Sequence, residues 1–528
     1  MLLSDLVATS AAVAATRSRK AKVAALAELL SRVTPDVDAA DTLPYGEPAE
    51  IEIVVSYLGG ALLQRRTGLG YRGLSSLPEP AAEPELTVRE VHEAFEHLAG
   101  LEGKGSQAAR ATAVVELFGR ATATEQPWLR GLVTGEVRQG ALDSLVQEAL
   151  AQASGVPLTA LRRAAMLAGA TVAVARAAVT GGEAALAEVG LEVLRPVLPM
   201  LASTSPSVGE ALTKAAGKAG GPVAVDTKLD GIRVQVHRHG EEVVVATRSL
   251  EVITERLPEV VEIVRALPAT SLVLDGEVLA LDDTTGRPRP FQETASRTAM
   301  SEGVVVTPYF FDVLHLDGTD LLDSPAHERL DLLEQLVPER HRVARVVTDD
   351  AAEAERFLTE VVAAGHEGVV VKQLAAPYAA GRRGSAWVKV KPVHTLDLVV
   401  VAVERGSGRR RGWLSNIHLA ARDPDSPTGF TMLGKTFKGM TDEMLAWQTQ
   451  RFTELAVEER AEGQRGDDGD WVVRVRPEQV VEIAIDGVQR STRYPGGVAL
   501  RFARVVRYRD DKSPDEADTL ATVQSLLT

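Results

Sequence analysis

The spacing of apolar residues changes once along this chain, and the change limits what the chain can fold into. Up to about residue 195, Ala, Leu and charged residues recur at helical spacing, as in residues 23–30. From about Pro222 apolar and polar residues alternate, and two such runs flank His239 and Gly240, which predicts a β-hairpin. We therefore expect a helical region followed by regions that are rich in β-strands.

Three domains are predicted from this pattern and from the chain length of 528 residues, for which two to four domains are usual. Residues 1–195 form the helical domain, and residues 196–391 form a domain of mixed strands and helices. Pro392 is a natural hinge, because proline breaks backbone pairing. Beyond it, short strands separated by turn residues predict a small barrel over residues 392–528. These strands are expected at residues 398–403, 417–420, 471–475 and 480–484.

The composition excludes several classes of protein. The chain has no cysteine, which rules out disulfides, thiol catalysis and cysteine-ligated metals. Residues 1–5 lack the basic start of a secretory signal, and no charge-free apolar run reaches the roughly 18 residues that a membrane span needs. We therefore expect a soluble, intracellular protein.

The charge of the chain gives two opposing indications. A net charge of −15 is unfavourable for binding nucleic acid, because phosphate contacts depend on Lys and Arg. Net charge says little about local patches, however. Two short segments are strongly basic, namely Arg409, Arg410 and Arg411 and the run Arg501, Arg504, Arg507 and Arg509.

Lys228 is the leading candidate for a catalytic residue. It begins the string K-x-D-G-x-R, which ends at Arg233 and lies between two apolar runs. A lysine with its usual pKa of about 10.4 is protonated at neutral pH, but desolvation or nearby cations make it a nucleophile. Lys389 and Lys391 alternate along an expected strand and so share a face. We expect them to lower the pKa of Lys228 and to hold a phosphate; the alternative is that Lys228 only flanks an Asp-Gly turn.

Three further candidates follow in the order that such chemistry needs. Glu277 ends an expected buried strand, where it would ligate Mg²⁺ or a ribose hydroxyl, although Asp-Gly-Glu is also a common turn. Phe311 would stack on a purine, or else fill the core. Glu367 precedes a buried strand that ends at Lys372, and a buried carboxylate needs a metal or a partner; the alternative is a surface salt bridge.

This ordered set of residues resembles the ATP-dependent DNA ligases of the covalent nucleotidyltransferase superfamily, in the archaeal and eukaryal type that also occurs in actinobacteria. The resemblance covers nearly all of the chain. It implies a multidomain α + α/β protein with a helical DNA-binding domain, an ATP-grasp-like adenylation domain and an OB-fold β-barrel. It also implies ATP as substrate, Mg²⁺ or Mn²⁺ as cofactor, nicked double-stranded DNA as partner, a monomeric state and a nucleoid-associated place in the cytoplasm.

The resemblance assigns a role to each candidate residue. Lys228 corresponds to the lysine that receives AMP, with Glu277 and Glu367 at the metal. The closing motif corresponds to residues 501–512, whose R-x-D-K ending is specific to these ligases, and includes Arg501, Arg509, Asp511 and Lys512. The nucleotide-binding positions are Asp226, where the family often has Glu, and Arg233 (ribose), Arg248 (phosphate), Glu277, Phe311 (adenine), Arg383, Lys389 and Lys391 (triphosphate).

Two segments are expected to contact DNA by the same resemblance. Gly135, Arg138 and Gly140 correspond to a stretch that meets the minor groove, where glycine permits close approach and arginine enters a narrow groove. The alternative is that the two glycines are loop and cap positions. Residues 409–411 would clamp DNA after the C-terminal domain swings away from the nucleotide.

Other functions share part of this pattern. An RNA ligase or a GTP-dependent capping-type nucleotidyltransferase has the same lysine string, and a non-catalytic DNA-binding relative has the same fold. The long helical region and the R-x-D-K ending favour a DNA ligase. The lack of cysteine weighs against the NAD⁺-dependent ligases, which typically carry a four-cysteine zinc site.

Overall fold

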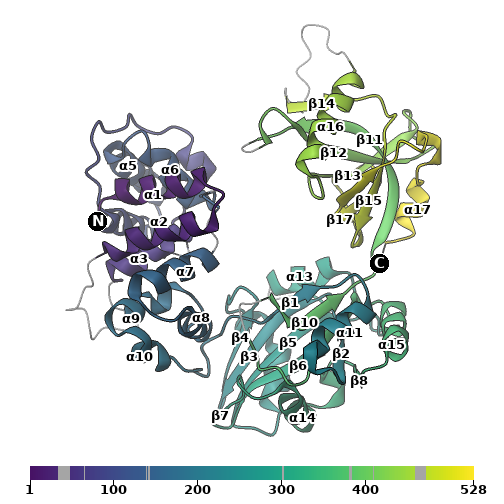
Figure 1. Ribbon diagram of the computed structural model, residues 1–528, viewed down its shortest axis with the longest axis horizontal. Helices are drawn as coiled ribbons and strands as arrows, with labels where there is room; N and C mark the ends of the chain where they lie inside the picture. Colours follow the sequence, from purple (N-terminus) through teal and green to yellow (C-terminus); the bar gives the residue numbers. More distant parts are fainter. Residues whose placement is uncertain are drawn as a thin grey trace.

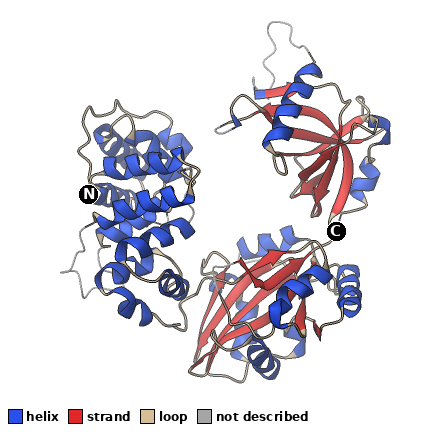
Figure 2. Cartoon of the chain, in the orientation of Figure 1, coloured by secondary structure: helices blue, strands red, loops and turns tan. Residues whose placement is uncertain are grey.

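The chain forms three lobes that follow one another in sequence (Figure 1). The computed structural model describes residues 1–33, 48–64, 66–137, 139–140, 143–299, 303–379, 383–407, 410–457 and 471–527. The first lobe is helical, and the other two contain the strands (Figure 2). The change in apolar spacing near residue 195 therefore marks a real change of architecture.

The helical lobe has one apolar core that extends from Leu3 to Leu186. Helix α4 shows why these segments fold as they do. Thr87 and Glu90 cap its start by reciprocal hydrogen bonds, and Val91, Phe95 and Leu98 point into the core at helical spacing. The prediction of a helical N-terminal region is confirmed. Its α-helices are α1 Leu3–Ala15, α2 Arg19–Ser31, α3 Glu50–Leu58, α4 Val88–Gly100, α5 Ser106–Arg120, α6 Glu125–Thr134, α7 Asp143–Ser154, α8 Leu158–Leu167, α9 Ala175–Thr180 and α10 Gly182–Ala187.

No single helix among the described residues is long and apolar enough to cross a membrane. Residues Leu158–Leu167 and Val172–Thr180 meet the length and composition criteria only as a pair, with a bend of 114° between them.

The middle lobe contains two five-stranded sheets. In both sheets the neighbouring strands are antiparallel, except that β1 runs parallel to β10. The first sheet has the order β1-β10-β9-β2-β8, with β1 Leu201–Thr204, β10 Arg383–Val390, β9 Gly368–Gln373, β2 Val223–Lys228 and β8 Arg345–Thr348. The second sheet has the order β4-β3-β5-β6-β7, with β4 Glu242–Thr247, β3 Ile232–His239, β5 Ser271–Ala280, β6 Val306–Leu316 and β7 Thr319–Asp320.

Helices cover both sheets of the middle lobe. Helices α11 and α15 pack on the first sheet, and α12 and α14 pack on the second, while α13 lies against β5 and β3. Their bounds are α11 Val208–Ala216, α12 Pro258–Arg265, α13 Phe291–Ala299, α14 Ala326–Leu336 and α15 Ala351–Ala363. The faces of the two sheets that these helices leave uncovered frame a cavity, which is described below.

The predicted hairpin is present, but the predicted end of one strand is wrong, and so is the alternative of a turn there. Strands β3 and β4 pair across His239 and Glu242, and Gly240 takes a φ of 59° in the turn. Glu277 neither ends its strand nor sits in a turn, because β5 continues to Ala280 and pairs with β3 and β6 on its two sides. The Asp-Gly-Glu string resembles a turn locally, but pairing with both neighbours keeps it extended.

The C-terminal lobe is rich in β-strands, as predicted. Strands β13-β12-β11-β15-β18 form a sheet, β14 adds to β11, and β16 pairs with β17. The core of this lobe contains only residues from this lobe, between Leu396 and Val523. The elements are β11 His394–Arg405, β12 Leu414–Arg422, β13 Phe430–Thr436, α16 Asp442–Glu454, β14 Val472–Arg474, β15 Val480–Ile485, β16 Gly487–Arg490, β17 Val498–Arg501, β18 Arg504–Tyr508 and α17 Leu520–Gln524.

Candidate active site

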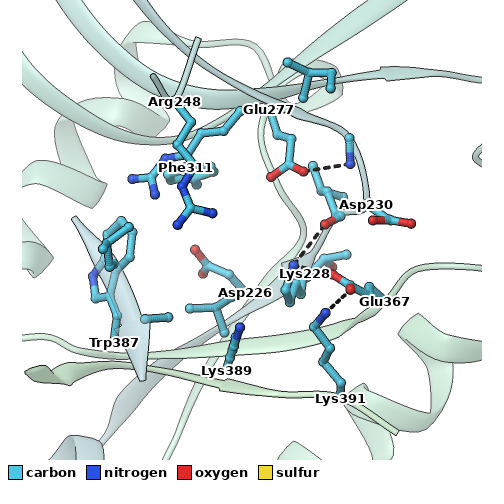
Figure 3. A pocket seen from close by; sticks show the side chains of 18 of the residues that line it. Asp226, Lys228, Asp230, Arg248, Glu277, Phe311, Glu367, Trp387, Lys389 and Lys391 are labelled. Atoms are coloured by element: carbon cyan, nitrogen blue, oxygen red, sulfur yellow. Dashed lines mark hydrogen bonds and ion pairs between the residues drawn. The ribbon is translucent and has the colours of Figure 1, made fainter. Parts of the chain in front are cut away.

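A cavity of about 760 Å³ opens between the two sheets of the middle lobe. Strands β2, β9 and β10 form one wall, β3, β5 and β6 form the other, and Arg501 and Phe502 reach its rim from the C-terminal lobe. Two aromatic rings, Phe311 and Trp387, lie at one side, and Lys228 lies at the other (Figure 3). The sequence candidates therefore meet in one place although they are far apart in the chain.

Lys228 is the last residue of β2, a strand that is otherwise buried. The turn that follows requires glycine at position 231, because a Cβ there would lie 2.2 Å from the carbonyl oxygen of Val278. The Gly231 N–H donates to Glu277 Oε1 at 2.7 Å. This turn therefore fixes Lys228 and Glu277 on facing walls of the cavity.

Glu367 lies between two lysines. It forms ion pairs with Lys228 through one carboxylate oxygen and with Lys391 through the other. Figure 3 marks the pair with Lys391. Burial lowers the pKa of Lys228, but the charges of Glu367 and Glu277 outweigh it, so the pKa lies above its ordinary value. The prediction that Lys389 and Lys391 lower the pKa of Lys228 is wrong for this state, because a carboxylate stands between Lys391 and Lys228.

Glu277 and Glu367 are suited to one metal ion that a phosphate also binds. Burial raises the pKa of Glu277 to about 7, so a cation beside this carboxyl would favour its charged form. Within the described part of the chain, no group of three or more His, Cys, Asp or Glu residues is arranged to hold a metal. Mg²⁺ usually takes one or two carboxylates together with substrate phosphates, and these two residues fit that arrangement.

The aromatic side of the cavity is built from rings and buried cations. Phe311 and Trp387 meet edge to face, with ring centres 5.9 Å apart. The Arg233 guanidinium lies 5.5 Å from the centre of the Phe311 ring. A flat base fits such a place, because aromatic faces stack on one another.

Arg233 and Asp226 are bound mainly by other protein groups. Arg233 donates to both carboxylate oxygens of Asp275, at 3.0 and 2.6 Å, and to the Met200 carbonyl at 2.6 Å. Asp226 accepts from Arg345 at 2.8 Å and pairs with Lys372 at 2.7 Å. Both residues line the cavity, but these contacts hold the cavity walls, and their contact with a nucleotide stays a prediction.

The remaining nucleotide-binding candidates lie at different distances from this centre. Arg248 is exposed and extends into the cavity; no hydrogen bond or ion pair of its side chain occurs within the described part of the chain. Lys389 and Lys391 line the same cavity. Arg383 begins β10, but its side chain lies outside what the structure describes.

The closing motif divides into two places. Arg501 reaches the cavity rim, where its two terminal nitrogens pair with Asp230 at 2.7 and 3.2 Å. Arg509 and Lys512 instead bind Asp397 within the C-terminal lobe, at 3.1 and 2.6 Å. Asp511 pairs with Arg509 at 2.7 Å. Only the first part of the motif therefore lies at the nucleotide cavity in this arrangement.

Comparison with known proteins decides the family. Three family models match the chain: "DNA ligase N terminus" over residues 60–151, "ATP dependent DNA ligase domain" over residues 199–391 and "ATP dependent DNA ligase C terminal region" over residues 410–512. A "Probable DNA ligase" from a Nocardioides species is 69% identical over 527 residues, which cover 100% of this chain and 99% of the relative. A "Probable DNA ligase" from Kineococcus radiotolerans is 64% identical, with 100% of both chains covered.

The chain belongs to the ATP-dependent DNA ligase family. A solved structure named "Pmar-Lig_PreS3" is similar in fold, with a TM-score of 0.61 and 17% identity over 96% of this chain and 99% of its own. The protein is an enzyme that uses ATP and a divalent metal such as Mg²⁺ and acts on nicked DNA. This assignment replaces the three alternatives, namely an RNA ligase, a capping-type enzyme and a non-catalytic relative.

The described residues among the predicted DNA contacts lie at a helix end and in turns. Gly135 ends α6 with a φ of 68°, and Gly140 has a φ of 67° in the loop that follows. These are the cap and loop positions of the alternative interpretation, and such positions also permit contact with DNA. Arg410 donates to the Phe437 carbonyl at 2.8 Å, and Arg411 is exposed. Arg138 and Arg409 lie outside the described residues.

The sequence did not indicate several residues that build the ligase cavity. Arg345 binds Asp226, Tyr378 donates to Asp275 at 2.6 Å, and the Trp387 ring completes the aromatic side. Arg345 and Tyr378 lie outside the short motifs that the sequence analysis singled out, whereas Trp387 lies two residues before Lys389. An acid such as Asp226, which directly follows three apolar residues of a buried strand, was the one available signal that a basic partner must exist.

Proposed function

We propose that Lys228 is the residue on which this DNA ligase carries AMP between ATP and a nicked DNA. The observation that supports the proposal is the position of its amine. It lies across the cavity from Phe311 and Trp387 and beside Lys391, with Arg248 and Arg501 at the rim. A nucleotide whose base stacks on Phe311 would thus direct its phosphates toward Lys228.

In the first step, the Lys228 amine loses a proton and attacks the α-phosphorus of ATP. An N–P bond forms and the bond from the α-phosphorus to the bridging oxygen breaks, so that pyrophosphate leaves. Lys389, Lys391 and Arg248 would balance the charge that develops on the phosphate oxygens. The triphosphate would also compete with Glu367 for Lys391. This competition would change the surroundings of the Glu367 carboxylate, whose charge helps to keep the pKa of Lys228 high.

The second and third steps return the lysine to its starting form. A 5′-phosphate oxygen at the nick attacks the phosphorus of AMP, the N–P bond breaks, and the lysine amine takes up a proton. The 3′-hydroxyl then loses its proton and attacks the activated 5′-phosphate, which expels AMP and joins the strand. Glu277 and Glu367 would hold a metal ion, which neutralises phosphate charge and orients the leaving group when it is bound.

We also assign finer roles to the three lobes. Residues 1–195 would be the DNA-binding domain, residues 196–391 an adenylation domain of ATP-grasp-like fold, and residues 392–528 an OB-fold barrel. Gly135, Arg138 and Gly140 would meet the minor groove, and Arg409, Arg410 and Arg411 would clamp the duplex. A monomer in the cytoplasm, associated with the nucleoid, fits these roles.

Transfer of radiolabel from α-labelled ATP to the protein tests the central proposal. We expect wild-type ligase to become labelled and Lys228→Ala to remain unlabelled. Lys218→Ala is the matched control, because Lys218 is exposed and lies in the same lobe. Lys228→Ala should still join a nick that already carries AMP on its 5′-phosphate. Label on the Lys228→Ala protein would exclude Lys228 as the nucleophile.

A further inference from the structure

Three charged side chains meet beside Phe311. Asp226 on β2, Arg345 on β8 and Lys372 on β9 have side-chain exposures of 2%, 10% and 3%. Asp226 binds Arg345 at 2.8 Å and Lys372 at 2.7 Å. Burial alone would raise the pKa of Asp226, but the two cations hold it below its ordinary value. Removing charges from water costs free energy unless the charges are paired. Here Asp226 is paired with both Arg345 and Lys372.

Both cations also bind the backbone of Phe311. Its carbonyl oxygen accepts from Arg345 Nη2 at 3.3 Å and from Lys372 Nζ at 3.2 Å. The Lys372 ammonium lies 4.6 Å from the centre of the Phe311 ring and 4.4 Å from the centre of the Trp387 ring. At these distances a buried cation is attracted by the ring faces. Lys372 therefore contacts the carbonyl and both rings at once.

This cluster joins the two walls of the cavity. Asp226, Arg345 and Lys372 belong to the first sheet, whereas Phe311 is on β6 of the second. Asp226 also lies two residues before Lys228 on β2, so their side chains share one face of the strand. The position of the Phe311 ring is thus tied to the strand that carries the lysine.

We propose that Lys372 is a positioning residue for ATP, which fixes the Phe311 and Trp387 rings at the distance from Lys228 that places the α-phosphate for attack. This inference rests on the proposed role of Lys228. It assigns Lys372 to the binding of ATP and not to the later sealing of DNA. Asp226 and Arg345 act indirectly. Asp226 holds the Lys372 ammonium in place, and Arg345 holds the Phe311 carbonyl.

The kinetics of the separate steps test the inference in the full-length protein. Lys372→Met keeps most of the side-chain volume but removes the charge and its donors. We expect the KM for ATP in self-adenylation to rise about tenfold, because the variant loses two cation–π contacts and the hydrogen bond to the Phe311 carbonyl. Joining of a pre-adenylated nick should be affected less than self-adenylation, because that step needs no triphosphate and the DNA itself brings the adenylate to the cavity. Lys372→Arg restores a cation and a donor and should return most of the affinity for ATP.

Two comparisons separate this role from a structural one. Lys214→Met is the control, since Lys214 is exposed on α11 in the same lobe. Equal losses in self-adenylation and in joining of the pre-adenylated nick, together with a lower melting temperature, would overturn the inference. If Lys372→Met does not fold, Arg345→Lys replaces it. That variant keeps the charge but loses the second nitrogen, and an unchanged KM for ATP would then count against the inference.

The outcomes also distinguish this inference from the proposed function. Suppose that labelling depends on Lys228 but that Lys372→Met has a normal KM for ATP. This result would contradict only the role proposed for Lys372. Labelling that persists in Lys228→Ala removes the proposed nucleophile, and the inference about Lys372 falls with it.

Discussion

The two connections between the lobes are built from different interactions. The segment between the helical lobe and the middle lobe is docked as part of a core. Val197 and Met200 are 0% and 1% exposed, and the N–H groups of Leu194, Val197 and Met200 donate to His237, Gln235 and Tyr378 at 3.1, 2.8 and 3.0 Å. Burying one such apolar side chain is worth about 1.5–3 kcal/mol.

The connection to the C-terminal lobe relies on charges instead. Lys391 pairs with Asp486 at 3.5 Å, and Arg501 pairs with Asp230 at 2.7 Å. These groups are between 18% and 28% exposed, and ion pairs near a surface contribute only about 0–1 kcal/mol each. The same charges can exchange one partner for another, a phosphate included. The difference predicts that the C-terminal lobe moves during the reaction while the helical lobe keeps its attachment to the middle lobe.

The largest predicted effect comes from removing the C-terminal lobe. A chain that ends at residue 391 keeps the cores of the first two lobes, because the C-terminal core contains none of their residues. Without Arg501 over the cavity, we expect self-adenylation with ATP to slow by on the order of 10³-fold. Quenched-flow labelling measures this rate. A truncated chain that labels itself at the full rate would show that the closing motif has no part in the step.

Arg501→Ala should give the next largest effect. It removes the cation that the C-terminal lobe brings to the cavity, and we expect self-adenylation to fall by about 10²-fold. Arg507→Ala is the control, since Arg507 belongs to the same motif but is 61% exposed and pairs with Glu482 in its own lobe. If both substitutions slow the step equally, the contact of Arg501 with Asp230 has no special role.

The docked connection should respond to pH through His237. Its Nδ1 accepts from the Leu194 N–H and its Nε2 donates to Gln235 at 2.8 Å, so the ring is neutral. Burial lowers the pKa of His237 to about 3, below its unfolded value of about 6.5. The unfolded chain therefore takes up the proton first. Stability from this group is complete above about pH 6.5 and is lost as the pH falls toward 3.

Unfolding measurements at two pH values check this expectation. Between pH 7.5 and pH 5, His237 should account for a loss on the order of 2 kcal/mol in the free energy of unfolding. His237→Gln should lack this part of the pH dependence. His239→Gln is the matched control, because His239 is exposed two residues along the same strand. An identical pH dependence in wild type and His237→Gln would contradict the docked, neutral state of this histidine.

The comparison also shows what the sequence revealed and what it did not. Lys228, Glu277, Phe311 and Glu367 could be found because each lies in a short string whose pattern is local. Alternating apolar residues likewise predicted β3 and β4, since a half-buried strand imposes that period. Short apolar runs between turn residues predicted β11 and β15. Local pattern was therefore sufficient for the order of a helical region and two β-rich regions, and for several residues that line the cavity.

Pairings between distant residues were not predictable in this way. Arg345 lies 119 residues from Asp226, and Asp230 lies 271 residues from Arg501, so no local spacing indicates either contact. The pKa of Lys228 was predicted in the wrong direction for the same reason. The sequence shows three lysines that share a site, but only the fold shows that Glu367 stands between two of them.

The smallest predicted effect concerns an ion pair at the docked connection. Arg163 of α8 holds Asp323 of the middle lobe through two hydrogen bonds of 2.7 Å, but the two side chains are 50% and 71% exposed. Arg163→Ala should therefore lower the free energy of unfolding by less than about 1 kcal/mol and leave self-adenylation unchanged. Val197→Ala, at a fully buried position of the same connection, should cost more, about 1–3 kcal/mol. If Arg163→Ala proved the more destabilising of the two, charges rather than apolar burial would hold the helical lobe, and the two connections would be alike.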